Sequence, residues 1–326
     1  MAREAAATRL PDKRGSRLSN FLAYIRKYWF LYMLILPGFV CMVVFNYAPM
    51  YGIQLAFKNY SPRAGIWGSE WIGFNNFARM FKDPNFIRAF KNTISINLKN
   101  LAFGFTFNVF LALMINEMKL RRVKPIVQTC VYLPYFLSWV IFAGLVQVFL
   151  EYPSTADVGG VLNQIIGALG GEPIDFLKQP KLFQTILVIT NVIKTAGYST
   201  IVYLASLAGV DPALYESAQI DGANGFQRIR YITLPTLKPT VVILFLFAVG
   251  GILKGNFGLF YNLVGNNSML FKTTDIIETY VYRSMMNSFN FAQSSAVGLF
   301  QSVVGFFIVI AANAFAKKLD PDYALF

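Results

Sequence analysis

The 326-residue chain contains no histidine and only two cysteines, Cys41 and Cys130. Without histidine it lacks the commonest metal ligand and general base. Two cysteines that both lie in apolar runs provide neither a metal-binding spacing nor a disulfide framework. No residues are arranged as in a catalytic triad. These absences predict a protein that is not an enzyme, with no catalytic residues, no metal site and no cofactor of its own.

Charged residues are also scarce. They make up 14% of the chain, against roughly 25% in a soluble domain, while 56% is hydrophobic and the mean hydropathy is +0.49. This composition predicts an integral membrane protein. The formal net charge of +13 does not indicate nucleic-acid binding, because the basic residues stand between apolar runs and form no face. Anchoring beside anionic lipid explains them better.

Aspartate and glutamate are absent from six apolar runs, each near the roughly 20 residues that cross a bilayer. The runs cover about 29–49, 93–116, 126–150, 183–207, 239–262 and 291–316. Backbone groups in lipid must be satisfied within each segment, so the runs are predicted to be helices, and their continuity argues against a β-barrel. We therefore expect an all-α polytopic membrane protein with one six-helix domain over 29–316.

The basic loops predict the orientation. With the N-terminus inside, the cytoplasmic segments are 1–28, 117–125, 208–238 and the tail 317–326. The short loop 117–125 holds four basic residues against Glu117 alone, whereas 151–182 on the other side holds more acids than bases. The long loop 50–92 has a basic excess and disagrees, but long loops follow the positive-inside rule weakly. We expect both termini in the cytoplasm.

The basic tail 1–28 is predicted to end in a short helix on the cytoplasmic membrane surface. Leu18, Phe21, Leu22 and Ile25 recur at helical spacing, and basic residues flank them. A cleaved signal peptide is not expected, because the following apolar run is longer than a typical signal core and lacks a clear small-x-small cleavage site.

The most informative stretch lies between the fourth and fifth apolar runs. Asp211 and Pro212 suit a helix start, Gly222 suits a sharp turn between two short helices, and Pro235 is expected to close the second of them before the fifth membrane helix. Glu216, Ala218, Gly222, Ile232, Leu234 and Pro235 fall at fixed spacings along this segment.

That spacing resembles the cytoplasmic EAA loop of binding-protein-dependent ABC importer permeases, with Ser217 in place of the usual alanine. The resemblance implies the type I importer permease fold and a loop that couples to a separate ATPase. The implied coupling residues are Glu216, Ser217, Ala218, Asp221, Gly222, Ala223, Ile232, Leu234 and Pro235. The alternative is an ordinary helical hairpin between two membrane helices.

Further stretches resemble the carbohydrate branch of these permeases, which includes importers of oligosaccharides and of alginate or pectin fragments. They include Leu36-Pro37-Gly38, Trp71-Ile72-Gly73 and Leu133-Pro134-Tyr135. The resemblance implies a bacterial inner-membrane permease that works by alternating access. It also implies four kinds of partner: a second permease, two ATP-binding subunits that hold ATP and Mg²⁺, an extracytoplasmic solute-binding protein, and lipid. Residues 250–256 lack the Gly-Lys-Ser/Thr ending of a phosphate loop, which agrees with an external motor.

Polar residues recur on single faces of the apolar runs. The stripes are Asn97, Asn100, Gly104 and Asn108; Asn191, Lys194 and Tyr198; and Lys254, Gly258 and Tyr261. Together with Lys99 they suggest a sugar path formed by Asn97, Lys99, Asn191, Lys194, Tyr198, Lys254 and Tyr261. The alternatives are contacts between helices and snorkelling near the outer surface. Because no acid accompanies the three lysines, we hypothesise a path for acidic, uronate-type sugars.

Two other functions remain open from the sequence. One is a secondary transporter or channel without an ATPase, and the other is an ABC importer of a solute that is not a sugar. Copurification with an ATP-binding subunit separates the first from an importer, and the chemistry of the transported solute decides the second.

Overall fold

The computed structural model describes residues 17–120, 122–154 and 158–319. The predictions for residues 1–16, Arg121 and residues 320–326 lie outside this part.

The chain divides into two units, Met1–Gln54 and Leu55–Phe326. In the first, α1 (Arg17–Met42) is followed by the π-helical turn η1 (Val43–Tyr47). Tyr28 has non-helical angles (φ −115°, ψ 21°), so α1 is two helices joined at a kink. The kink falls where the surface helix was expected to give way to the first membrane helix; the location on a membrane surface stays a prediction.

The 3₁₀ segment η2 (Ala48–Phe57) leads to a small folded cap at the start of the second unit. Here β1 (Lys58–Asn59) pairs antiparallel with β2 (Glu70–Trp71), the short helix α2 (Gly65–Gly68) lies between them, and α3 (Asn75–Lys82) follows. The buried Asn76 amide donates to the carbonyl oxygens of Ala56 and Lys58, each at 3.0 Å. These bonds fasten the hairpin to α3, so the segment from β1 to α3 has a defined structure.

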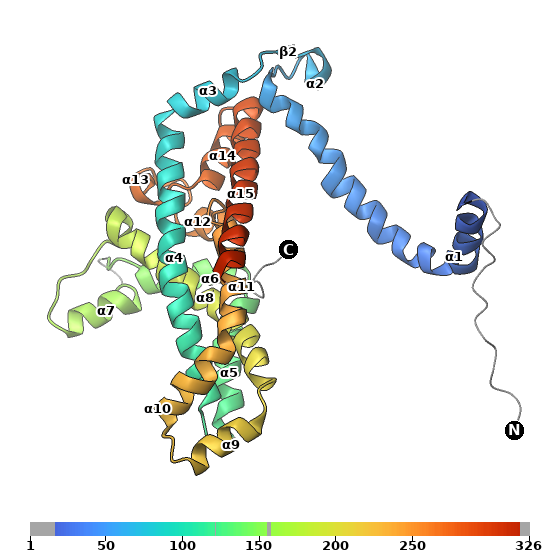
Figure 1. Cartoon of the computed structure of the whole chain (residues 1–326). Helices are drawn as coiled ribbons and strands as arrows, with labels where there is room; N and C mark the ends of the chain where they lie inside the picture. The colour runs from blue at the N-terminus through green and yellow to red at the C-terminus, as the bar shows by residue number, and fades with distance from the viewer. Residues whose placement is uncertain (1–16, 121, 155–157, 320–326) are drawn as a thin grey trace, which may run out of the picture. The chain divides into compact units, whose positions relative to one another are not determined.

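Three long helices form the frame of the second unit: α4 (Pro84–Asn116), α8 (Pro180–Ala208) and α15 (Phe291–Leu319). α4 begins nine residues before the predicted start at 93, because Asp83 Oδ1 accepts from the Asn85 backbone N–H at 2.8 Å and Pro84 suits the first turn. α8 packs along α4, and α15 packs against α11, α14 and α3 (Figure 1).

The third apolar run is not one helix, and the prediction of a continuous helix over 126–150 was wrong. It forms α5 (Val123–Phe136) and α6 (Trp139–Leu150), bent by 106° at Leu137 and Ser138. Pro134 weakens the end of α5, and the Ser138 hydroxyl accepts from the Ile141 backbone N–H at 3.3 Å. A proline followed by a new N-cap ends one helix and starts another.

The fifth span lies earlier in the chain than the predicted 239–262. Helix α9 (Pro212–Ile220) is followed by one helical run, Gly225–Gly250, made of α10 (Gly225–Arg228), the π turn η4 (Ile229–Thr233) and α11 (Leu234–Gly250). Pro235 does not close the run as expected; it lies in the first turn of α11, and the wider π turn before it accommodates a residue without an N–H. The run ends at Gly250–Gly251, so α12 (Phe257–Leu263) is separate.

The remaining elements are α7 (Val161–Ala168), η3 (Phe176–Lys178), α13 (Phe271–Thr274) and α14 (Ile277–Met286). Within the described residues, five helices are long and apolar enough to cross a membrane, and the bent pair α5–α6 supplies a sixth span if it is counted as one. The expectation of an all-α membrane fold is confirmed.

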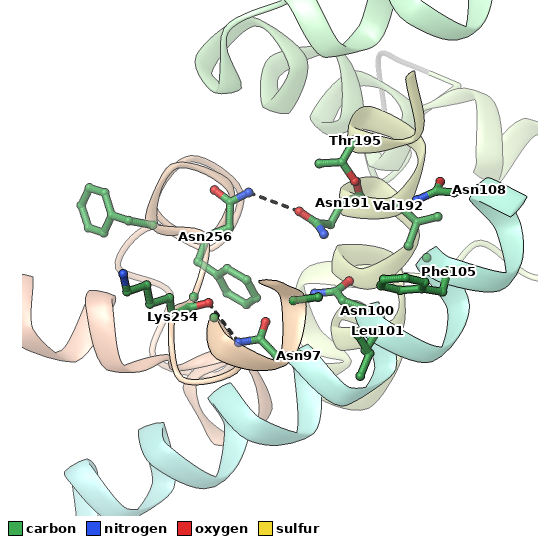
Figure 2. A pocket seen from close by; sticks show the side chains of 16 residues that line it. Asn97, Asn100, Leu101, Phe105, Asn108, Asn191, Val192, Thr195, Lys254 and Asn256 are labelled. Atoms are coloured by element: carbon green, nitrogen blue, oxygen red, sulfur yellow. Dashed lines mark hydrogen bonds between the residues drawn. The ribbon is translucent and has the colours of Figure 1, made fainter. Parts of the chain in front are cut away.

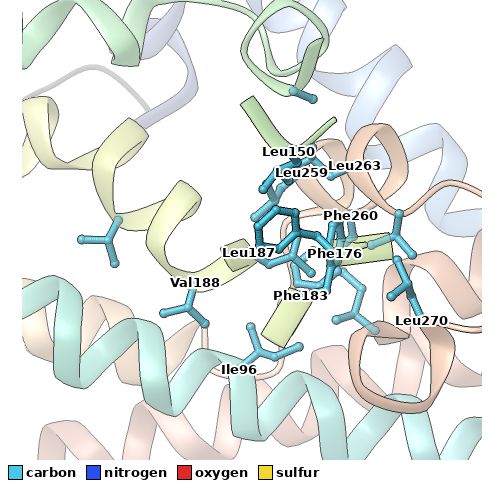
Figure 3. Packing of buried hydrophobic residues seen from close by; sticks show 14 residues of the cluster. Ile96, Leu150, Phe176, Phe183, Leu187, Val188, Leu259, Phe260, Leu263 and Leu270 are labelled. Atoms are coloured by element: carbon cyan, nitrogen blue, oxygen red, sulfur yellow. The ribbon is translucent and has the colours of Figure 1, made fainter. Parts of the chain in front are cut away.

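The largest buried apolar cluster lies where α4, α6, α8 and α12 meet (Figure 3). Phe183 and Leu187 of α8 are fully buried, with Leu259 and Phe260 of α12 at 1% and 2% exposure. Where α8 crosses α5, Gly197 permits a close approach: a Cβ there would lie 2.8 Å from the Val131 carbonyl oxygen. The cluster holds α12 and the segment after it against α8.

Candidate functional site

A cavity of about 520 Å³, here called the central cavity, lies between α4, α8 and the segment from the end of α11 to α12 (Figure 2). Its walls are Asn97, Asn100, Leu101, Gly104, Phe105, Asn108, Asn191, Val192, Thr195, Ala248, Gly251, Lys254, Gly255, Asn256, Phe257 and Phe260. All four members of the predicted stripe on α4 therefore face one space, together with Asn191 of α8.

Asparagine side chains organise this cavity. The Asn97 amide donates to the carbonyl oxygens of Ile252 (2.7 Å) and Lys254 (3.0 Å), which holds the turn after α11 against α4. The Asn256 amide nitrogen donates to Asn191 Oδ1 at 3.2 Å and so joins this turn to α8. Asn256 Oδ1 also accepts from the Leu259 backbone N–H and caps α12.

Two other asparagines keep free acceptors. The side-chain oxygens of Asn100 and Asn108 are buried and have no hydrogen-bond partner among the described residues. A buried acceptor without a partner is unfavourable unless water or a ligand satisfies it. Both residues line the central cavity. A ligand rich in hydroxyl groups supplies the matching donors.

Lys254 is the charged residue in the lining of the central cavity. It lies in the turn after α11, its side chain is exposed, and none of the ion pairs formed by described residues includes it. The predicted alignment of Lys254 with Gly258 and Tyr261 on one helix was wrong, because α11 ends at Gly250. The Tyr261 ring instead stacks on Phe257 of the cavity wall, with centroids 5.1 Å apart.

Lys194 and Tyr198 face the bend between α5 and α6. The Lys194 ammonium donates to the carbonyl oxygens of Pro134 (3.1 Å), Tyr135 (3.1 Å) and Leu137 (2.7 Å). It also lies 4.8 Å from the centre of the Trp139 ring, and its side chain is buried. Tyr198 stacks on Tyr135. Lys194 thus neutralises the carbonyl end of α5 and does not line the central cavity.

Lys99 is directed at α8, outside the lining of the central cavity. Its ammonium donates to the Gln184 side-chain oxygen, and the Gln184 amide nitrogen donates to the Thr273 carbonyl oxygen at 2.6 Å. Of the three lysines predicted on the path, the structure places one, Lys254, at the cavity.

The segment from α9 to η4, here called the coupling loop, lies at the end of the second unit away from α3 (Figure 1). Asp211 Oδ1 caps α9 by accepting from the Ala213 N–H at 2.9 Å. Gly222 turns the chain with φ +78°, a conformation that L side chains rarely adopt. Asn224 and Gln227 form a reciprocal capping box at α10.

The predicted coupling residues lie on this loop and, for Leu234 and Pro235, in the first turn of α11 directly after it, and five of the nine are exposed. Glu216, Ser217, Asp221, Gly222 and Pro235 are exposed, whereas Ala218, Ala223, Ile232 and Leu234 are half-buried. The Tyr215 hydroxyl lies 3.1 Å from the buried Thr233 hydroxyl and ties α9 to η4. Large apolar side chains are exposed beside them: Leu214, Ile220, Phe226 and Tyr231. Such exposed apolar residues on a rigid turn suit contact with another protein.

Several residues near these sites were not found by sequence reasoning. Asn256 and Phe257 of the cavity wall follow Lys254 closely, and an asparagine after a glycine-rich turn was a readable helix-start signal. Arg88 and Arg283 form an ion cluster around the buried Asp275 carboxylate near the opposite end of α4. Their separation of up to 195 positions in the chain left no local pattern.

Comparison with known proteins places this architecture in a family. Residues 104–323 match the model of the binding-protein-dependent transport system inner membrane component. The chain is 40% identical over 293 residues to the polygalacturonan/rhamnogalacturonan transport system permease protein YteP of Bacillus subtilis (strain 168), covering 90% of this chain and 89% of that protein. It is 39% identical over 308 residues to LplB of the same organism, covering 94% of each.

A solved structure agrees with these relatives. A chain in the crystal structure of a bacterial ABC transporter involved in the import of the acidic polysaccharide alginate has a TM-score of 0.83 and 39% identity, and the match covers 92% of this chain and 99% of that one. The protein described here therefore belongs to the family of inner membrane components of binding-protein-dependent transport systems, as a permease subunit.

Proposed function

We propose that this permease subunit carries carboxylated oligosaccharides through the central cavity. The observation that carries the proposal is the pairing of Lys254, which has no acidic partner among the described residues, with an asparagine-rich wall. That the transported solutes are sugars is supported by the names of the relatives. Two of these names, polygalacturonan and alginate, belong to chains of uronate sugars.

The cavity residues act on such a chain in separate ways. Asn100 and Asn108 accept hydrogen bonds from sugar hydroxyls through their unpaired oxygens. The exposed Lys254 ammonium attracts the carboxylate at the cavity wall. Phe257 offers an apolar ring to the C–H face of the sugar. The cavity thus binds neutral hydroxyls and one negative charge within one space.

Opening the cavity to alternate sides of the membrane requires energy from a separate ATPase. We propose that the coupling loop faces the cytoplasm and docks on an ATP-binding subunit through its exposed apolar residues, with Glu216 and Arg230 at the rim. A second permease, two ATP-binding subunits that hold ATP and Mg²⁺, and an extracytoplasmic solute-binding protein complete the importer. ATP binding closes the two ATP-binding subunits and tilts the permease pair between inward-open and outward-open states.

The test is uptake by the reconstituted complex of trigalacturonate and of the neutral trisaccharide maltotriose. Lys254→Gln is compared with Lys181→Gln, which removes an exposed lysine that does not line the central cavity. We expect the KM for trigalacturonate to rise about tenfold in the first variant, equivalent to one charge-assisted hydrogen bond of roughly 1.4 kcal/mol. Equal uptake of both sugars, with no effect of Lys254→Gln, contradicts the proposal.

A further inference from the structure

A second polar cavity lies at the end of α4 away from the coupling loop. It has a volume of about 390 Å³ and is here called the arginine cavity. Its walls are Asp83, Asn85, Arg88, Phe271, Tyr280, Arg283, Ser284, Asn287, Ser288, Asn290 and Gln293. Phe271 is the one apolar residue among them. A recess with this many donors and acceptors suits a polar ligand.

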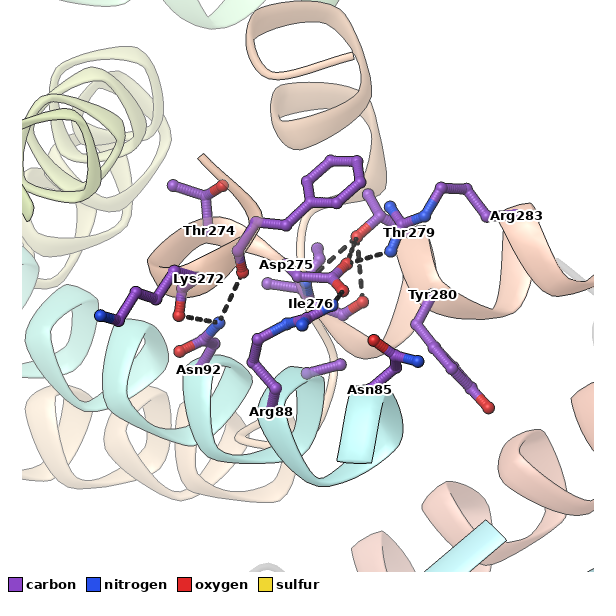
Figure 4. A network of polar contacts seen from close by, with 12 residues as sticks. Asn85, Arg88, Asn92, Lys272, Thr274, Asp275, Ile276, Thr279, Tyr280 and Arg283 are labelled. Atoms are coloured by element: carbon purple, nitrogen blue, oxygen red, sulfur yellow. Dashed lines mark hydrogen bonds and ion pairs between the residues drawn. The ribbon is translucent and has the colours of Figure 1, made fainter. Parts of the chain in front are cut away.

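One buried carboxylate holds both arginines (Figure 4). Asp275 is 1% exposed, and its two oxygens accept from different guanidinium groups, from Arg88 at 3.2 Å and from Arg283 at 2.6 Å. Thr279 donates its hydroxyl to the same carboxylate, and the Arg283 guanidinium lies 4.2 Å from the centre of the Phe271 ring. Both arginines are therefore fixed before any ligand arrives.

This arrangement leaves guanidinium donors unused. Each arginine has five N–H groups, and within the described residues each guanidinium contacts a single carboxylate, that of Asp275, through one nitrogen. Arg88 Nε is buried and has no partner. A buried donor without a partner is unfavourable unless a ligand or water accepts from it. The fork geometry of an arginine fits a carboxylate or a phosphate.

The charges of the arginine cavity limit the ligand further. Asp275 and Asp83 offset the two arginine charges, so a ligand with a single negative charge is repelled less than a doubly charged phosphate. Asp83 is itself engaged, because it accepts from the Asn85 backbone N–H (2.8 Å) and from the Tyr280 hydroxyl (2.7 Å). Burial, and then Asp83, raises the pKa of the Tyr280 phenol, so that group stays a donor. The remaining amides and hydroxyls suit a ring with one carboxylate and several hydroxyl groups.

Helix α4 lines both cavities, with different residues. Asn97 of the central cavity lies nine residues after Arg88 on the continuous helix α4, a rise of about 14 Å. On α14, Arg283 faces the arginine cavity, while the preceding Tyr282 lies 3.4 Å, oxygen to oxygen, from Tyr261 beside the central cavity. A saccharide of several rings is long enough to span this distance.

We propose that the arginine cavity is a second saccharide subsite, which takes one carboxylated ring of a chain whose leading rings occupy the central cavity. The inference rests on the proposed function, since it requires acidic oligosaccharides as solutes. It predicts a preference that depends on chain length, because a short saccharide occupies one cavity at a time and a long one occupies both.

The experiment measures uptake of digalacturonate and hexagalacturonate by the reconstituted complex with Arg88→Gln. Lys91→Gln is the matched control, because Lys91 is exposed on the same helix and lines neither cavity. We expect Arg88→Gln to raise the KM for hexagalacturonate about tenfold and to leave that for digalacturonate unchanged. Lys91→Gln should change neither.

A second variant guards against misfolding, since Arg88→Gln removes a partner of the buried Asp275. Asn287→Asp places a negative charge on the exposed rim and leaves the ion cluster intact, and it should act in the same direction. If both variants impair the two saccharides equally and also reduce stimulation of ATP hydrolysis by the binding protein, the cavity is a protein docking site and the inference is overturned. Unchanged uptake of hexagalacturonate also overturns it, whereas failure of wild type to import either sugar refutes the proposed function instead.

Discussion

The Lys194 ammonium lies 2.7 Å from the carbonyl oxygen of Leu137, the first residue after α5. With the carbonyls of Pro134 and Tyr135 it forms a three-acceptor cap on a broken helix. A cation at this position offsets the partial negative charge at the end of α5. The lysine therefore supports the bend and lies outside the lining of the central cavity.

Lys194→Met should lower the stability of the complex and leave its preference among saccharides unchanged. Three carbonyl groups lose a charged donor, and hydrogen bonds to charged groups make a net contribution of roughly 1.5–3 kcal/mol. The matched variant Lys99→Met removes a single bond to Gln184 and should act more weakly. Thermal unfolding of the purified complex in detergent measures both. If Lys99→Met lowers the thermal midpoint more than Lys194→Met does, Lys194 is not the main support of the bend.

Gly222→Ala should weaken the coupling of ATP hydrolysis to uptake. A Cβ at Gly222 meets no atom within 4 Å, so the expected effect comes from the backbone alone, with φ +78° costing about 1–2 kcal/mol for alanine. Asn tolerates this conformation better, so Gly222→Asn is the control and should retain more coupling. The ratio of saccharide imported to ATP hydrolysed gives the answer. Equal ratios for both variants contradict a role for the backbone turn.

Gly197→Ala should destabilise the packing of α8 on α5. The added Cβ would lie 2.8 Å from the Val131 carbonyl oxygen and 2.9 Å from the Tyr132 Cα, and backbone atoms cannot move away cheaply. Gly104→Ala is the matched control, because its nearest neighbour, in Val192, is at 3.8 Å. We expect a loss of 1–3 kcal/mol, typical of overpacking, in the first variant and little in the second. Complex yield and thermal midpoint report the difference.

Asn256→Asp should raise the KM for acidic saccharides. The new carboxylate can still cap α12, but it cannot donate to Asn191 and it places a negative charge beside Lys254. Asn262→Asp makes the same change on α12, at a residue outside the lining of the central cavity, and should have little effect. Uptake of trigalacturonate by both variants is the measurement. If neutral and acidic trisaccharides are affected alike, electrostatic repulsion is not the cause.

Much of the fold could be predicted because lipid imposes a strong length rule. Apolar runs near 20 residues marked the spans, and 183–207 agrees closely with α8. The third and fifth runs failed because hydropathy does not report helix breaks: Pro134 with Ser138, and Gly250 with Gly251, are breaks inside apolar sequence. The stripe on α4 was readable from helical period alone.

The outcome for the lysines shows the limit of such reasoning. Asn191 and Lys194 lie on one face of α8, yet one lines the central cavity and the other caps α5. Their roles depend on where the neighbouring helices end, and the helical period of one segment gives no information about that. The cluster of Arg88, Asp275 and Arg283 depends on contacts between distant segments and could not be predicted at all.

The bend between α5 and α6 also has a consequence for the surrounding lipid. α5 has 14 residues and α6 has 12, so the pieces measure about 21 Å and 18 Å, and neither matches a hydrocarbon core of about 30 Å. At 106° their lengths do not add along one axis. Along α5 and α6 the hydrophobic surface is therefore shorter than the hydrocarbon core. Such a mismatch is accommodated by local thinning of the bilayer or by contact with a neighbouring subunit. We therefore expect bilayer thickness to act on this permease at the bend between α5 and α6.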